Sequence, residues 1–416
     1  MLAMIRRVIK KRRRVSIQSR LQQVTDEQDE QRRMRHAIRL IRFNSLTYGL
    51  QLFPSGSRCA AVTCALVSKL YYLLLLMGLG YSIFAFASVP GYKEDAVLVI
   101  VILVVSVSIY SFLRRNVSAI EEVIAGAGKY LTPADLDHVR RTDSWIMGFH
   151  LLTSAASLAC AALAGYFGCN VVRREAESMP FFKQNSVVYI YLSLGIGILF
   201  YLKFIYGVIV CSIQVYVITH TILGCLAHQV REAVRAPLTR RAVDVASLSR
   251  VRFCLRSYWH WKGKADAVLN VFPFCWASFL FLSSSLMLSK VIADWGDASE
   301  PRTFLFVSLF FAILVLLSLT TTWHLMTEAD KTMQDCVHLA FRVTDPRLVV
   351  PAATPAAAAE VRREILCLHM ELANAPDTHA TLLGSVRLDF ATLISFAAGL
   401  VNFSVMIINI RSAVKA

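Results

Sequence analysis

The last apolar segment of the chain, residues 388–410, carries a polar side chain at every seventh position. These residues are Ser395, Asn402 and Asn409. At 3.6 residues per helical turn, positions seven apart drift by only about 20° and therefore form one stripe along a helix. An amide inside a membrane is costly unless it faces protein or water. The stripe therefore faces either another helix of the same subunit or a water-filled pore.

The other apolar segments offer little acid–base or metal chemistry. Lys69, His150 and Lys203 can all reach an aqueous boundary, and so few ionisable groups argue against a proton-coupled transporter or a voltage sensor. An intramembrane enzyme would need paired acids or a His/Cys cluster at membrane depth, and none is seen. The ten cysteines form no CxxC pair and follow no regular spacing. We therefore expect no enzymatic activity, no cofactor and no metal site.

Aromatic side chains are the candidates for binding a small organic ligand, because they combine apolar area with polar tips. They lie in the outer halves of the third to sixth apolar segments. The ligand-binding candidates are Tyr166, Tyr189, Tyr191, Trp276 and Phe279, with Phe167 nearby. An interfacial aromatic belt is the alternative interpretation, and it fits Phe304 and Phe306 better than a pocket does.

The elements that position these residues are long apolar segments. The chain has 416 residues, of which 56% are hydrophobic and only 17% charged. A helix needs roughly 20 apolar residues to cross a bilayer core of about 30 Å. Candidate spans cover residues 59–88, 96–112, 145–172, 187–220, 267–292, 303–325 and 388–410. The sequence therefore predicts an all-α membrane protein with seven transmembrane helices.

The distribution of basic residues predicts the orientation of these helices. Of the 44 Lys and Arg residues, 34 lie in the N-terminal segment and in the second, fourth and sixth loops. The positive-inside rule makes that set cytoplasmic, with the N-terminus inside and the C-terminus outside. The net charge of +16 is thus explained by topology, and no nucleic-acid partner is expected.

The cytoplasmic side is predicted to carry most of the mass outside the membrane. Stretches with helical spacing of apolar residues occupy 226–234, 247–269, 323–343 and 361–374, and an Ala/Pro-rich linker is expected at 351–359. Met1–Arg14 is basic, so it either contacts anionic lipid or is a solvated tail. The domains expected are a cytoplasmic basic segment 1–58, a ligand-binding bundle 59–325, cytoplasmic anchor helices and linker 326–387, a last helix 388–410 and an extracellular tail 411–416.

Three segments near the C-terminus carry a resemblance to a known family. They are EADKTMQDCVHLAF at 328–341, RREILCLHMELAN at 362–374 and GSVRLDFATLISFAAGLVNFSVMIINI at 384–410. In order and in character they are similar to the insect gustatory receptors, within the insect chemoreceptor superfamily. The family's Thr-Tyr and Gln-Phe pairs in the last helix are replaced here by Asn402-Phe403 and Asn409-Ile410. The chain thus resembles a divergent member.

The resemblance implies a ligand-gated cation channel of the plasma membrane that responds to a small organic tastant. It implies a homo- or heterotetramer with a central pore lined by the seventh helix, cytoplasmic helix ends that form an anchor, and a ligand pocket in the outer half of each subunit. Asn409 and Ile410 then match the gate positions, with Val405 and Met406 one turn deeper and Asn402 and Ser395 further along the pore. No acidic residue lies between Ser395 and Ile410, so weak discrimination among cations is expected.

Two other classes of membrane protein share parts of this pattern. A G-protein-coupled receptor has seven helices, but its orientation is the opposite one, and the sequence has neither a DRY after the third segment nor an NPxxY in the seventh. A solute transporter would be favoured by an inverted internal repeat or by paired Gly/Pro-broken spans, and neither is found. Both remain the alternative interpretations.

Overall fold

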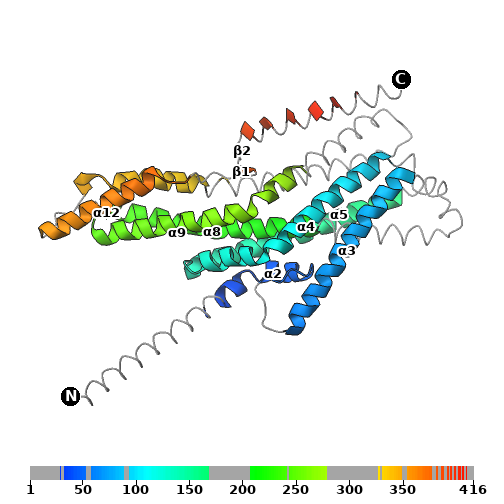
Figure 1. The fold of residues 1–416 in the computed structure, drawn as a ribbon, viewed down its shortest axis with the longest axis horizontal. Helices are drawn as coiled ribbons and strands as arrows, with labels where there is room; N and C mark the ends of the chain where they lie inside the picture. The colour runs from blue at the N-terminus through cyan, green and yellow to red at the C-terminus, as the bar shows by residue number, and fades with distance from the viewer. Residues whose placement is uncertain are drawn as a thin grey trace, which may run out of the picture.

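The computed structural model of the chain is helical over most of the part it describes (Figure 1). The described residues are 29, 32–52, 58–88, 93–167, 207–240, 243–278, 327, 330–348, 354–376, 381–382, 386–387 and, in the last segment, 391–392, 394–395, 398–399, 402–403, 405–406 and 409. The labelled elements are α2 (Arg39–Leu46), α3 (Arg58–Ser88), α4 (Lys93–Gly128), α5 (Pro133–Phe167), α8 (Gly207–Arg240), α9 (Val245–Leu269), η3 (Pro346–Leu348), α12 (Pro355–Ala373), β1 (Thr381–Leu382) and β2 (Val386–Arg387). Residues 271–278 and 330–343 are also helical.

Several helices are much longer than a membrane crossing requires. The helix α4 has 36 residues and α5 has 35. At 1.5 Å per residue each is roughly 50 Å long, whereas a bilayer core is about 30 Å thick. The helical stretches predicted at 226–234, 247–269 and 361–374 are confirmed within α8, α9 and α12.

The predicted spans match the helices to different extents. The first span coincides with α3, and the second lies within α4, which continues past it to Gly128. In the described part of the chain, two helical segments are long and apolar enough to cross a membrane, Cys59–Gly80 and Gly207–Arg240. The predicted sixth span, 303–325, lies outside the described residues. The count of seven and the orientation therefore stay predictions.

The starts of α5 and α9 follow from local sequence. Thr132 and Asp135 exchange hydrogen bonds in front of α5, with Pro133 as its first residue. Asp244 and Ser247 form a capping box at the start of α9. Such side chains satisfy backbone N–H groups that have no partner inside the helix.

The predicted Ala/Pro-rich linker is in part wrong, because Pro355–Ala359 belong to α12. The Thr354 side chain accepts a hydrogen bond from the Ala357 backbone N–H at 3.2 Å and caps the helix. Proline at the first helical position loses no hydrogen bond there, and the alanines that follow have the highest helix propensity. The same composition that suggested a linker therefore starts a helix.

A second correction concerns the segment between α12 and the last helix. Residues Thr381–Leu382 pair antiparallel with Val386–Arg387, so β1 and β2 form a small hairpin. The prediction of an all-α chain missed this hairpin, because two-residue strands are too short to give an alternating pattern.

The core is built around α8, which packs against α4, α5 and α9. In the most apolar stretch of α8, 83% of the residues are buried. The helices α8, α9 and α12 extend side by side toward one end of the molecule (Figure 1). Gly126 of α4 faces the ring of Trp261 of α9 so closely that a Cβ would overlap it. A glycine is therefore required where these two helices meet.

The short helix α2 is fastened to the bundle by polar contacts. The Asp143 carboxylate of α5 accepts hydrogen bonds from the backbone N–H groups of Leu40 and Ile41, at 2.9 and 3.1 Å. The Asn44 side-chain amide donates a hydrogen bond to the side-chain oxygen of Gln214 in α8 at 2.7 Å. These contacts place part of the predicted basic N-terminal segment against the helices rather than in solvent.

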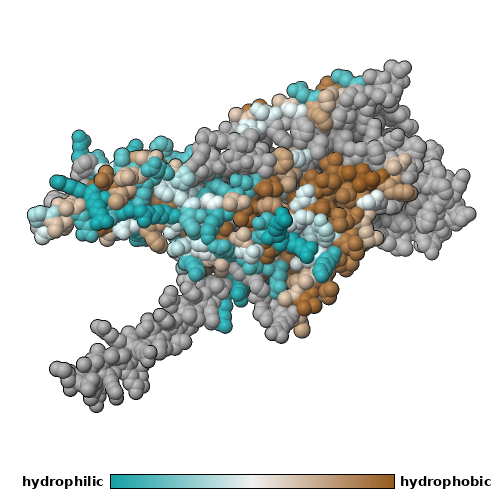
Figure 2. Space-filling view, in the orientation of Figure 1, coloured by the Kyte–Doolittle hydropathy of each residue, from teal (hydrophilic) through white to brown (hydrophobic). Residues whose placement is uncertain are grey.

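One face of α3 is apolar and uncovered. Its most exposed large side chains recur at helical spacing over several turns and are Val62, Leu66, Leu70, Leu73, Met77 and Phe84. Figure 2 shows a hydrophobic surface over the part of the molecule that contains α3 and the adjoining end of α4, whereas the end formed by α9 and α12 is hydrophilic. A contiguous apolar face of this kind is typical of contact with lipid.

Candidate functional site

The polar stripe of the last helix lies on a face that this chain does not cover. Ser395, Asn402 and Asn409 are all exposed and helical. Among them lie the apolar side chains Val405 and Met406, which are 48% and 47% exposed. The fragments of this helix run in one line toward the C-terminus along the side of the bundle (Figure 1). The described stripe residues therefore do not pack into the interior of their own subunit.

The residues that flank the stripe point partly toward the chain itself. Thr392, Gly399 and Phe403 are half-buried. Ser395 donates a hydrogen bond to the Ala391 carbonyl four residues earlier at 2.9 Å. That bond satisfies the hydroxyl donor within the helix and leaves its lone pairs available on the exposed face. Ile410, the second gate candidate, lies outside the described residues.

Trp276 is the ligand-binding candidate whose side chain is described, and it is only 3% exposed. Its indole N–H donates to the Ser212 hydroxyl of α8 at 2.9 Å. Its ring meets Tyr216 edge-on with centroids 5.2 Å apart and stacks with Phe272 at 5.9 Å. Trp276 thus fastens helical residues 271–278 to α8. Its role in contacting a ligand stays a prediction.

The other ligand-binding candidates are not brought together by the described structure. Tyr166 and Phe167 belong to the C-terminal end of α5. Tyr189, Tyr191, Phe279, Phe304 and Phe306 lie outside the described residues.

A buried charge cluster, missed by sequence reasoning, joins two helical segments, α9 and residues 330–343. The Lys262 ammonium of α9 bonds both oxygens of Asp266, at 2.7 and 2.8 Å, and lies 3.9 Å from an oxygen of Asp330. The side chains of Lys262 and Asp330 are 4% and 6% exposed. Burial raises the pKa of the Asp266 carboxyl, and Lys262 opposes that shift. Only the i,i+4 spacing of Lys262 and Asp266 was readable as a signal, and that spacing is also common on solvated helix faces.

A second charge cluster holds α12 against α9. The Arg252 guanidinium donates to Glu371 at 2.7 Å and to Glu364 at 2.5 Å, and Arg256 also bonds Glu371. Burial works to raise the pKa of the Glu371 carboxyl, but the hydrogen bonds from Arg252 and Arg256 outweigh it and keep that pKa below its usual range. The contacting residues of the two helices are 112 or more positions apart, so no local sequence pattern indicates the pairing.

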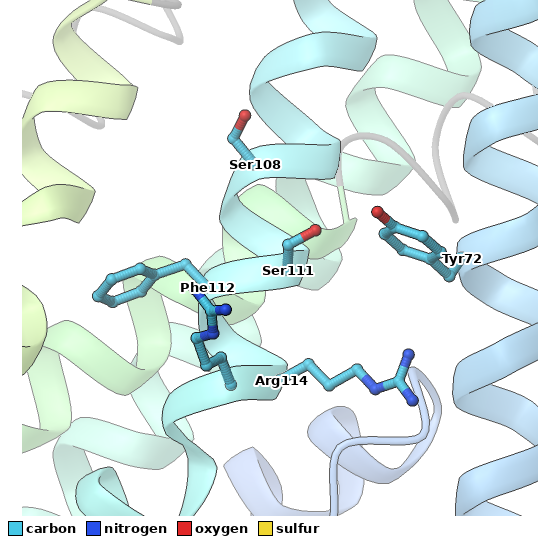
Figure 3. A pocket seen from close by; sticks show the side chains of 6 residues that line it. Tyr72, Ser108, Ser111, Phe112 and Arg114 are labelled. Atoms are coloured by element: carbon cyan, nitrogen blue, oxygen red, sulfur yellow. The ribbon is translucent and has the colours of Figure 1, made fainter.

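A cleft of about 650 Å³ opens between α3 and α4 (Figure 3). It is lined by Tyr72 of α3 and by Ser108, Ser111, Phe112, Arg114 and Arg115 of α4. The hydroxyls of Tyr72 and Ser111 point toward each other's helices, and the Arg114 side chain extends along the same side below them (Figure 3). None of these residues was among the predicted site residues.

Comparison with known proteins gives matches at the level of structure. Sequence comparison found no matching protein family and no matching curated protein. The chain is similar to the insect olfactory receptor OR5 from Machilis hrabei, with a TM-score of 0.60 and 11% sequence identity. The alignment covers 92% of this chain and 100% of that one. The same receptor in complex with eugenol matches with a TM-score of 0.58, also at 11% identity. The chain therefore shares the fold of an insect olfactory receptor.

Proposed function

Because the chain shares the fold of an insect olfactory receptor, we propose that it is a chemosensory receptor that acts as a ligand-gated, non-selective cation channel of the plasma membrane. The observation that carries the proposal is the exposed stripe of Ser395, Asn402 and Asn409. A membrane amide needs water or protein to face. If several copies surround an axis, these stripes face one another around an aqueous path, as the predicted tetramer requires.

The proposed gate lies at the outer end of the last helix. Apolar Ile410 and its neighbours close a dewetted constriction, and Asn409 offers an amide oxygen to passing cations when the constriction widens. Val405 and Met406 line the next turn. Because no fixed charge lies between Ser395 and Ile410, discrimination among monovalent cations is weak.

The ligand is proposed to be a small organic tastant. The resemblance of the C-terminal segments to gustatory receptors favours taste over smell, and eugenol in the complex of the similar receptor favours a small organic ligand. The candidate contacts remain Tyr166, Tyr189, Tyr191, Trp276 and Phe279.

The proposal is tested by expressing the full chain, alone and with related subunits, in an electrically silent cell. Whole-cell current is recorded during application of sugars, bitter compounds, amines and eugenol. We expect at least one compound to evoke a cation current. Asn409→Ala and Ile410→Ala should change basal leak or ion selectivity, while Asn374→Ala, which removes an exposed amide on α12, should not. Surface expression is measured for each variant.

Two outcomes would count against the proposal. The channel role is rejected if no compound evokes current although the protein reaches the cell surface. The pore assignment is rejected if current appears but the Asn409 and Ile410 variants behave like the wild type.

A further inference from the structure

The cleft between α3 and α4 is lined by side chains that donate hydrogen bonds. The hydroxyls of Tyr72 and Ser111 lie above the Arg114 side chain (Figure 3). Arg115 also lines the cleft, so two guanidinium groups contribute its positive charge. The Phe112 ring packs edge-on against Phe272, with centroids 5.4 Å apart, and closes the side toward the bundle. The cleft is thus polar and open on one side and aromatic on the other.

The positive charge of this cleft is not neutralised by the part of the chain that the structure describes. No carboxylate lines the cleft, and no ion pair joins Arg114 or Arg115 to a described acidic residue. Both arginine side chains are exposed. Guanidinium groups with neighbouring hydroxyl donors are the arrangement that recognises a phosphate, because the planar donors match two of its oxygens.

The position of the cleft distinguishes a lipid phosphate from a soluble one. Arg114 and Arg115 follow immediately after the apolar segment 96–112, at the predicted cytoplasmic boundary of the membrane. The Tyr110 hydroxyl of α4 donates a hydrogen bond to the Ser68 hydroxyl of α3 at 2.8 Å. This bond shows which residues of the two helices lie opposite each other. At and beyond this level α3 exposes Leu70, Leu73 and Met77, with exposures of 57%, 54% and 61%. A phosphate in the cleft would therefore have an apolar face beside it on which acyl chains can lie.

We propose that this cleft binds the headgroup of an anionic phospholipid of the cytoplasmic leaflet. Arg114 and Arg115 hold the phosphate, Tyr72 and Ser111 donate hydrogen bonds to its oxygens, and the acyl chains lie along the exposed face of α3. The bound lipid ties α3 to α4. The site requires only that the chain is embedded in a membrane, so it stands or falls separately from the channel proposal.

The test is a lipid titration of the purified full-length protein in detergent, read by native mass spectrometry. The probes are dioleoylphosphatidylglycerol, dioleoylphosphatidylcholine and inorganic phosphate. We expect phosphatidylglycerol to bind best and an excess of inorganic phosphate not to displace it. Arg114→Gln with Arg115→Gln should weaken phosphatidylglycerol binding about tenfold or more, because charge-assisted hydrogen bonds are lost.

Matched variants separate a built site from general charge attraction. Arg235→Gln with Arg250→Gln removes the same charge from exposed positions of α8 and α9 and should leave lipid binding unchanged. Tyr72→Phe with Ser111→Ala keeps both arginines and should weaken binding by a smaller factor. That pair also serves as the test if the arginine variant does not fold.

Three results would overturn the proposal. Equal loss in the two arginine pairs would mean that charge alone attracts the lipid. Equal binding of phosphatidylcholine and phosphatidylglycerol would remove the preference for anionic lipid. Displacement of the lipid by inorganic phosphate would identify a site for a soluble anion.

Discussion

At the scale of single residues, the surroundings of a side chain decide between roles that its type leaves open. Trp276 is a predicted ligand contact, and its buried indole also donates a hydrogen bond to the Ser212 hydroxyl. Asp143 was not a predicted site residue, but its carboxylate accepts two backbone hydrogen bonds from the start of α2. Both side chains contribute to packing, and each makes a measurable prediction.

Trp276→Phe should destabilise the protein by about 1 kcal/mol, because the ring is largely retained and the hydrogen bond to Ser212 is lost. Trp276→Ala should cost about 3–5 kcal/mol by leaving a cavity between Tyr216 and Phe272. Thermal unfolding in detergent measures both. Unchanged stability of Trp276→Ala, with loss of ligand response alone, would show that the indole contacts ligand rather than supporting the bundle.

Asp143 should make the stability of the fold depend on pH. Burial raises its pKa from 3.8 to about 6, and the hydrogen bonds from Leu40 and Ile41 only partly oppose this shift. The folded state therefore holds the proton more tightly than the unfolded state, and this contribution is complete below pH 3.8 and is lost as pH rises through about 6. The difference corresponds to roughly 3 kcal/mol.

The matching measurement compares unfolding temperatures of the wild type and Asp143→Asn across the interval from pH 3.8 to about 6 and just above it. The wild type should lose more stability over this interval than the variant, which cannot ionise. Parallel pH profiles would contradict the assignment.

At the scale of elements, charged side chains set how α12 lies on α9. The Arg252 guanidinium bridges Glu364 and Glu371, and these three side chains are 15%, 19% and 18% exposed. Partial burial strengthens such pairs relative to fully exposed ones. Glu360 of the same helix is exposed and serves as a control.

Glu371→Gln should loosen α12 by about 1–3 kcal/mol, since it removes the negative charge that pairs with both Arg252 and Arg256. Hydrogen exchange of the α12 backbone should become faster, whereas Glu360→Gln should have no such effect. Because the pKa of Glu371 is lowered in the folded state, acid should act like the substitution as pH falls through that lowered pKa. Equal exchange rates in both variants would show that the ion pairs of Glu371 do not hold α12 against α9.

Local sequence predicted the elements better than it predicted their contacts. Helical spacing identified 247–269 and 361–374, because the pattern and the caps lie within one helix. The bond from Asp143 to α2 spans 103 residues at Leu40, and no local pattern encodes a pairing over that distance. The linker was misjudged at Pro355 because proline and alanine suit both a loop and a helix start. In the candidate pore, the spacing predicted the stripe, while its exposure is a property of the whole subunit.

At the scale of the molecule, the surface divides into regions with different surroundings. The exposed apolar face of α3 suits lipid, and the end formed by α9 and α12 suits water (Figure 2). The exposed stripe of the last helix suits neither lipid nor bulk water as well, because Val405 and Met406 lie between the amides of Asn402 and Asn409. Such a mixed face is what the proposed pore requires, because its amides would face water at an axis of assembly.

Cysteine accessibility of the last helix during ligand-evoked current tests this account most directly. Three single variants are expressed separately: Ser395→Cys, Asn402→Cys and Asn409→Cys. The wild type shows how far its own ten cysteines react with the reagent, and Asn374→Cys is a control outside the stripe. A charged, membrane-impermeant thiol reagent is applied to the cytoplasmic face of an excised patch while the ligand, on the outer face, holds the channel open. The account predicts that the reagent reduces the current through the stripe variants and leaves the wild type and the control unaffected. Full current in all three stripe variants after treatment, with labelling of the control showing that the reagent is active, would contradict a pore along this helix.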